Sequence, residues 1–269
     1  MQTVTSGDLV EETSKTSRLV LLLDTPCFDE NERYQLLEST TNYPLFTGTP
    51  FASMLHVSPH LIELGAEHQA LLEACLEKRS GCIVVSDEPL KDMQQALAKQ
   101  LVVKSAVHGV SYLRFYTPMV TRAMIDDSIN PDPTWPIGEG VYLPDLKGKK
   151  WQPIDFSNVR SSITEQTTES LEQQIQIFRM AYSLGETPEC QALTEDELHR
   201  FATAIVCFHQ LPDFSFKALV AWQAYLMEHH HDFSDICWHT FFKATKSIPE
   251  AMEAAKQVVI NKNTPALGE

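Results

Sequence analysis

A chain of 269 residues is long enough for one large domain or two modest ones, and its formal net charge of −15 argues against several classes of partner. Nucleic acids and anionic membrane surfaces attract clustered lysines and arginines, which so acidic a chain does not offer. Hydrophobic residues make up 43% of the chain, and no apolar run approaches the roughly 18 residues of a membrane helix.

The cysteines and the first residues carry information about location. Six cysteines are scattered without CxxC spacing, which predicts reduced thiols in a cytoplasmic protein. Residues 1–17 are rich in Ser, Thr and Glu, and they lack the basic start and apolar core of a secretory signal. We therefore expect a loose tail there.

Alternating strand and helix patterns fill residues 18–130, which we expect to form an α/β domain with a mixed sheet. In chain order, the expected elements are a buried strand over 18–23, a helix over 67–78, a buried strand over 81–85, a helix over 88–100, strands over 101–107 and 110–116, and a helix from 117 to about 127. A two-residue turn at His108–Gly109 would join the last two strands into a hairpin, and this hairpin is the reason to expect a mixed sheet.

A connector and a helical lobe follow. Residues 131–160 are rich in Pro and Gly, which predicts an ordered connector without long elements, with room for a small hairpin. Residues 161–262 show helical spacing, with capping signals at Thr194, at Asp213 or Ser215, and at Ser247. Residues 263–269 are a short tail. The predicted architecture is thus an N-terminal α/β domain followed by a C-terminal helical lobe.

Motifs for catalysis or metal binding are few. The run His229–Asp232 invites a zinc site, but consecutive helical residues point about 100 degrees apart and no third ligand is evident, so we interpret the run as a polar helix end. Cys207 and His209 are two residues apart and would not face each other on a helix. Cys27 follows a strand end without an adjacent base. We predict no catalytic residue, no metal and no cofactor.

The clearest recognition pattern lies where the last predicted strand of the α/β domain meets its last predicted helix. Period-2 alternation places Tyr112, Arg114 and Tyr116 on one face, and Thr117 with Pro118 starts the helix. An arginine between two tyrosines suits protein recognition, because the guanidinium stays charged at any working pH. An equally open alternative is that a helix covers this face, so that the tyrosines are packing residues and Arg114 pairs with a buried carboxylate.

The same segment resembles a known family. Residues 113–120 read LRFYTPMV and are similar to the (L/F)RFYDPRV signature of the type VI secretion effector adaptor/chaperone family, also called Tap or TEC. Further pieces resemble this family in the same order, namely residues 21–24, 43–50, 58–64 and 85–90, so that the resemblance covers roughly residues 18 to 130. Thr117 and Met119 stand where the family has Asp and Arg, and the roles of those two residues are not carried over.

The resemblance implies a non-catalytic bacterial adaptor in the cytoplasm, which binds a cognate toxic effector and assists its loading onto the VgrG spike. The candidate partner-binding residues are Tyr112, Arg114, Tyr116 and Arg122, with Trp135 and Trp151 as weaker candidates. We expect Arg114→Glu to weaken partner capture and leave the fold intact, and a failure to fold would instead make Arg114 a structural ion-pair residue. Two alternatives stay open, namely a small-molecule or metal-dependent enzyme on the α/β domain and a structural subunit of a larger assembly.

Overall fold

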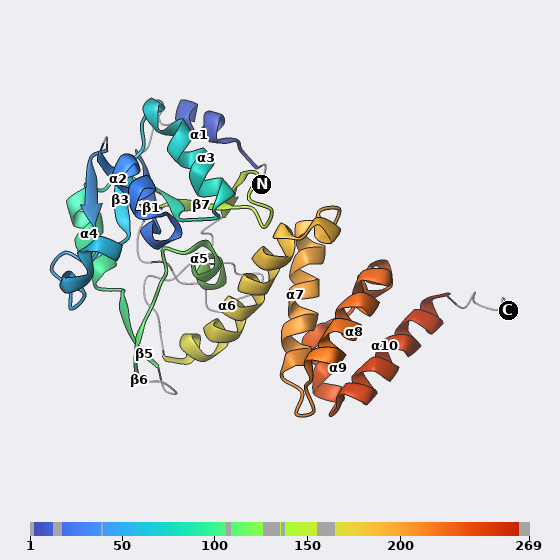
Figure 1. Ribbon diagram of the computed structural model, residues 1–269. Coiled ribbons are helices and arrows are strands. Elements are labelled where there is room, and N and C mark those ends of the chain that lie inside the picture. Colours follow the sequence, from blue (N-terminus) through green and yellow to red (C-terminus); the bar gives the residue numbers. More distant parts are fainter. Residues whose placement is uncertain are drawn as a thin grey trace. The chain divides into compact units, whose positions relative to one another are not determined.

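The computed structural model describes residues 3–12, 18–38, 40–105, 109–125, 135, 138–154 and 165–263. The chain divides into two compact units, Met1–Ile175 and Gln176–Glu269. The described strands all belong to the first unit, and the second consists of helices (Figure 1). The predicted α/β domain followed by a helical lobe is therefore confirmed. The division falls within helix α6 (Glu165–Glu186), whereas we placed the start of the helical lobe at residue 161.

Six strands of the first unit form one sheet in the order β2-β3-β1-β4-β7-β8. Their bounds are β1 Arg18–Leu23, β2 Asn42–Pro44, β3 His60–Glu63, β4 Cys82–Ser86, β7 Gly140–Pro144 and β8 Trp151–Ile154. Neighbouring strands of this described sheet are antiparallel throughout, so the expectation of a mixed sheet is wrong. β3 and β4 run in the same direction, with helix α3 (Gln69–Glu77) between them in the chain, but β1 is inserted between the two strands and pairs with both.

The predicted hairpin is present as a separate two-stranded sheet of β5 (Val102–Ser105) and β6 (Gly109–Tyr112). Its register pairs Ser105 with Gly109, so Gly109 belongs to the strand and not to a two-residue turn. The rest of the expected turn, His108, lies outside the described residues. The second strand ends at Tyr112 and does not continue to residue 116.

The central strand β1 is buried on both faces over residues 19–23, which explains its continuous apolar sequence. Leu19, Leu21 and Leu23 point into a core cluster that includes side chains of α3. On the other face of the sheet, helix α4 (Leu90–Ala98) lies against β2 and β3, and α5 (Pro118–Ile125) lies against β7.

The N-terminal segment is part of this core. Residues Ser6–Glu12 form helix α1, and its Leu9 is fully buried in the same cluster. The backbones of Val4 and Trp151 exchange two hydrogen bonds of 2.9 and 3.0 Å, which extends the sheet beyond β8. The expectation of a loose tail is therefore wrong for residues 3–12, because Leu9 is buried in the core and the Val4 backbone pairs with Trp151.

The stretch predicted as a connector contributes two strands to the main sheet. β7 and β8 form a hairpin, and β7 pairs with β4. The hairpin loop contains Gly148, whose φ of +67° is a left-handed conformation that glycine adopts without strain. Residues 131–134, 136–137 and 155–160 of this stretch lie outside the described residues.

The second unit consists of helices over its described residues, as the spacing of apolar residues in the sequence predicted. After the end of α6 come α7 Glu195–His209, α8 Phe216–Glu228, α9 Trp238–Ala244 and α10 Ile248–Asn263. Thr194 caps α7 in a capping box with Glu197, and Ser215 caps α8. The Phe208 ring stacks on Trp222 at 5.0 Å between centroids in the core of this unit. None of the described helices is both long and apolar enough to cross a membrane.

Candidate functional site

The segment with the recognition pattern connects the hairpin to helix α5. After β6 ends at Tyr112, the Leu113 N–H donates to the Leu101 carbonyl, and the chain turns so that the Thr117 N–H donates to the Arg114 carbonyl. Helix α5 begins at Pro118, as predicted. Since the strand ends at Tyr112 and the chain turns, the side chains of Tyr112, Arg114 and Tyr116 do not share one strand face.

Arg114 pairs with Asp24, the residue that follows β1. Its Nη2 atom lies 3.3 and 3.1 Å from the two carboxylate oxygens of Asp24. The side chain of Asp24 is only 4% exposed, whereas that of Arg114 is 49% exposed. Burial raises the pKa of Asp24, and the positive charge of Arg114 opposes this shift. The structure therefore contains the ion pair between Arg114 and a buried carboxylate that the alternative expected, whereas Tyr112 is not covered as that alternative also required.

Cys27 lies beside the same carboxylate and is held in its protonated form. Its Sγ atom is 3.4 Å from Asp24 Oδ2 and acts as the donor. Loss of solvent around the sulfur, followed by the negative charge of Asp24, raises the pKa of Cys27 to about 11. Since the thiolate is the reactive form, this thiol is a poor nucleophile at neutral pH.

The two tyrosines have different environments although their hydroxyl groups are 2.8 Å apart. Tyr116 is buried, and its ring lies 5.8 Å from the Arg114 guanidinium. Tyr112 is 37% exposed, and its ring packs on Phe51 at 4.7 Å and on Phe46 at 5.9 Å between centroids. Phe51 precedes a short helical segment, Ala52–Val57, that exposes Met54 and Leu55.

We call Phe51, Tyr112 and Arg114 the Tyr112 face. It combines an aromatic pair with a half-exposed guanidinium whose position is determined by a buried partner. Tyr and Arg are enriched at protein interfaces because they offer a large contact area and several donors at low entropic cost. The face is therefore suited to bind a polypeptide, and it contains two of the six predicted residues.

The other predicted residues lie inside the first unit. Arg122 is buried and donates to the Gln152 side chain at 2.8 Å and to the Pro144 carbonyl at 3.3 Å. Trp135 is buried against Phe115, with a ring separation of 5.9 Å.

Trp151 is fully buried, and its indole N–H donates to Ser6 Oγ at 3.3 Å. Together with the burial of Tyr116, these positions leave four of the predicted side chains without surface for a partner. Arg122, Trp135 and Trp151 are each at most 4% exposed, so in this structure they do not offer the accessible surface that the prediction of contact residues assumed.

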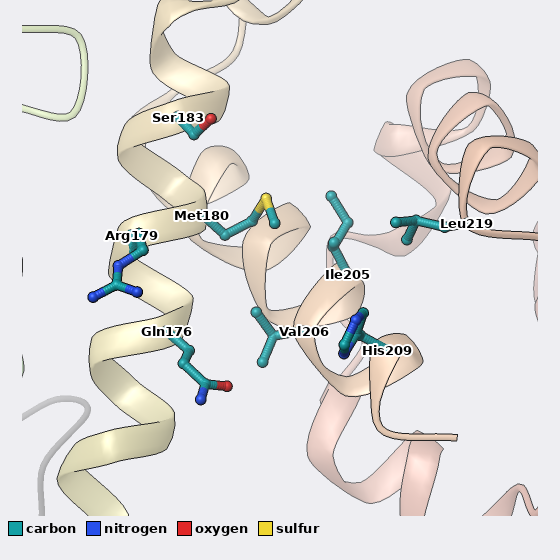
Figure 2. A pocket seen from close by; sticks show the side chains of 8 residues that line it. All are labelled: Gln176, Arg179, Met180, Ser183, Ile205, Val206, His209 and Leu219. Atoms are coloured by element: carbon teal, nitrogen blue, oxygen red, sulfur yellow. The ribbon is translucent and has the colours of Figure 1, made fainter. Parts of the chain in front are cut away.

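A second candidate site is a pocket of about 390 Å³ in the helical unit (Figure 2). The residues that line it come from α6, α7 and α8 and are Gln176, Arg179, Met180, Ser183, Ile205, Val206, His209 and Leu219. Figure 2 shows Met180 reaching from α6 toward Ile205 on α7, whereas Arg179 points away from that helix. Helical spacing in the sequence does not reveal this pocket, because it marks Ile205 only as an apolar position and not as the wall of a cavity.

The other thiol considered in the sequence, Cys207, does not pair with His209. Its Sγ lies 3.7 Å from His239 Nδ1, and burial raises the pKa of Cys207 to about 11. A thiol in this state is no better a nucleophile than Cys27.

Comparison with known proteins finds one family that is similar to part of the first unit. Residues 21–132 match the family described as "Domain of unknown function (DUF4123)". The matched segment includes Asp24, Phe51, Tyr112 and Arg114, so it contains the Tyr112 face and the buried ion pair. No curated protein and no solved structure matches the chain.

Proposed function

We propose that this protein is a type VI secretion adaptor or chaperone, which binds a cognate toxic effector and assists its loading onto the VgrG spike. The match of residues 21–132 supports this proposal together with the family resemblance of the sequence. The protein acts in the bacterial cytoplasm and works by reversible binding.

The observation that carries the proposal is the convergence of separate motif pieces on one place. Asp24 ends the first piece and pairs with Arg114 of the last. Phe46 of the second piece packs on Tyr112, and its N–H donates to the Ser58 hydroxyl of the third at 3.0 Å. The first and last pieces thus meet at Arg114, and the second and third meet beside the neighbouring Tyr112, which supports a shared site.

The chemistry of this place favours recognition over catalysis. The carboxylate of Asp24 is occupied by Arg114, and the neighbouring thiol of Cys27 has a raised pKa. The exposed parts are an aromatic ring and a guanidinium, which form contacts but do not transfer protons at neutral pH. We propose that the Tyr112 face contacts the effector or the spike.

The pocket in the helical unit offers a second contact. Its wall contains Met180, Ile205 and Leu219, and methionine adapts its shape to different apolar partners. We propose that this pocket receives apolar side chains of the effector, which would otherwise be exposed before secretion.

The experiment that tests the function is affinity capture with the tagged full chain from bacteria that express the secretion system, followed by mass spectrometry. The expected result is one large toxin-like protein together with a VgrG-type protein. Recovery of neither would contradict the adaptor function. Tyr112→Ala tests the Tyr112 face, and Tyr34→Ala, at an exposed tyrosine outside the motif pieces, controls for the loss of a surface tyrosine. If Tyr112→Ala recovers as much effector and spike protein as the control variant does, the Tyr112 face is not the contact surface.

A further inference from the structure

The histidines that follow helix α8 do not lie on a regular helix. Helix α8 ends at Glu228, His229 has a non-helical φ of −116°, and His230–Phe233 form one 3-10 turn. The rings of His230 and His231 are consequently close, with 3.7 Å between their centroids. The histidines thus follow a helix end, as the interpretation of the run expected, and the 100-degree spacing of helical residues does not apply to them.

A carboxylate from another helix lies next to this turn. Glu197 belongs to the first turn of α7, and its Oε2 accepts hydrogen bonds from the Thr194 N–H at 2.8 Å and the Thr194 hydroxyl at 2.9 Å. Its Oε1 atom is 4.0 Å from His231 Nδ1. The capping box thus holds a negative charge beside the two imidazoles.

One donor atom each of Glu197, His230 and His231 lies within 4.8 Å of the others. The Nδ1 atom of His230 is 3.1 Å from the Met227 carbonyl, which can only accept, so Nδ1 is the donor of this hydrogen bond and Nε2 is the ring nitrogen left to face a metal ion. Metal-binding histidines commonly have this arrangement, in which a backbone carbonyl orients the ring and selects the tautomer.

We propose that Glu197, His230 and His231 form a binding site for a divalent transition metal ion of the zinc type. Two imidazole nitrogens and one carboxylate oxygen are a ligand set that zinc accepts, whereas magnesium prefers oxygen ligands alone. Zinc binding requires these side chains to bring each donor atom to roughly 2.0–2.2 Å from the ion. The bound ion connects the start of α7 to the turn between α8 and α9, and a fourth coordination position stays open to water or to a partner protein.

The exposure of the site determines how tightly it binds. The side chain of His231 is 83% exposed, so the ion is reached easily from solvent and exchanges readily. The site therefore binds its ion reversibly, and it differs in this from a structural zinc site that is always occupied. This site is not evident from the sequence, because Glu197 lies on α7 whereas the histidines follow the next helix, α8.

Isothermal titration of the full chain with ZnCl2, after removal of metals with a chelator, tests the proposal. We expect one equivalent of zinc to bind and MgCl2 to give no comparable signal. His230→Gln should weaken zinc binding at least about tenfold. Glu197→Gln should do the same without unfolding α7, because glutamine also forms a capping box. His229→Gln is the matched control and should leave the affinity unchanged.

The outcomes separate the site from adventitious binding. Zinc should also raise the midpoint of thermal unfolding of the native chain, and this rise should be lost in His230→Gln. If the native chain binds no zinc at one equivalent, the proposal is overturned. It is equally overturned if His230→Gln and Glu197→Gln bind as tightly as the native chain, or if His229→Gln loses as much affinity as they do.

Discussion

Arg114 donates hydrogen bonds to both carboxylate oxygens of Asp24, a residue 90 positions earlier in the chain. The pair joins the end of the central strand to the turn before α5, and it lies at the edge of the Tyr112 face. A surface charge is thus held in position by a buried one. The same contact therefore affects both the stability of the first unit and the shape of the proposed interface.

Replacing Arg114 should destabilise the protein. Arg114→Met leaves the carboxylate of Asp24 buried without its cation, and we expect a loss of about 1–3 kcal/mol in the free energy of unfolding, since one partner is buried and the other half-exposed. Arg114→Glu should cost more, because two carboxylates would then meet, and the earlier expectation that this variant leaves the fold intact is revised accordingly. Urea denaturation measures both. Asp24→Asn in the Arg114→Met background should recover part of the loss, and an unchanged or lower stability of the double variant would contradict the ion-pair interpretation.

The cost of Arg114→Met should depend on pH. Burial raises the pKa of Asp24, so the native state loses stability as pH rises and this carboxyl group becomes ionised. The positive charge of Arg114 offsets this loss. At a pH near or below the usual aspartate pKa, the carboxyl group is protonated and no longer needs its cation. The stability difference between the native chain and Arg114→Met should therefore be smaller at pH 4 than at pH 7. A difference of the same size at both pH values would show that Arg114 stabilises through packing and not through its charge.

Trp151 should be essential for folding and not for recognition. The indole is fully buried in the core cluster of the first unit. We expect Trp151→Ala to lower the free energy of unfolding by about 3–5 kcal/mol, because it leaves a large cavity. Chemical denaturation measures this loss. A stable Trp151→Ala variant with impaired partner capture would reverse the assignment and return Trp151 to the interface.

Local signals in the sequence were sufficient to place most elements of this protein. The run at residues 18–23 coincides with β1, Pro118 marks the start of α5, and the capping box of Thr194 starts α7. Each of these signals depends on neighbours within a few residues, where the chemistry of strands and caps decides the structure. These elements can therefore be predicted without knowledge of the fold.

Long-range pairings were not readable in the same way. The resemblance and the alternation pointed to Arg114, but the partner Asp24 is one of 36 acidic residues, and the sequence does not select it. Arg122 and Trp151 became buried because β7 pairs with β4, a register that depends on sheet order. Glu197 likewise meets His230 and His231 only through the packing of separate helices. The candidate site could be located from sequence, but its buried and exposed members could not be told apart.

His60 should make the protein less stable in mild acid. Burial lowers the pKa of His60 from 6.5 to about 4, and its Nδ1 lies 2.8 Å from Asn42 Oδ1. As pH falls from 7 to 5, the unfolded chain binds a proton at this residue and the folded chain does not, so stability is lost. For one such group the loss is about 2 kcal/mol. His60→Gln should remove it, so urea midpoints at pH 7 and pH 5 should differ less in this variant. An equal decrease in both proteins would contradict the lowered pKa.

The proposed contact between the effector and the pocket of the helical unit can be tested by changing an exposed residue of the pocket, without changing the core of that unit. Ser183 lies at its rim and is exposed, so Ser183→Trp can place an indole over the apolar wall while the helix remains intact. If the effector inserts an apolar side chain there, we expect its recovery in affinity capture to fall about tenfold, which corresponds to the loss of one good interface anchor. Ser183→Ala controls for loss of the hydroxyl, and Lys256→Trp, at an exposed position of α10 outside the pocket lining, controls for an added surface tryptophan. Undiminished recovery with Ser183→Trp would exclude the pocket as the effector contact. The Tyr112 face would then be the remaining candidate among the described residues.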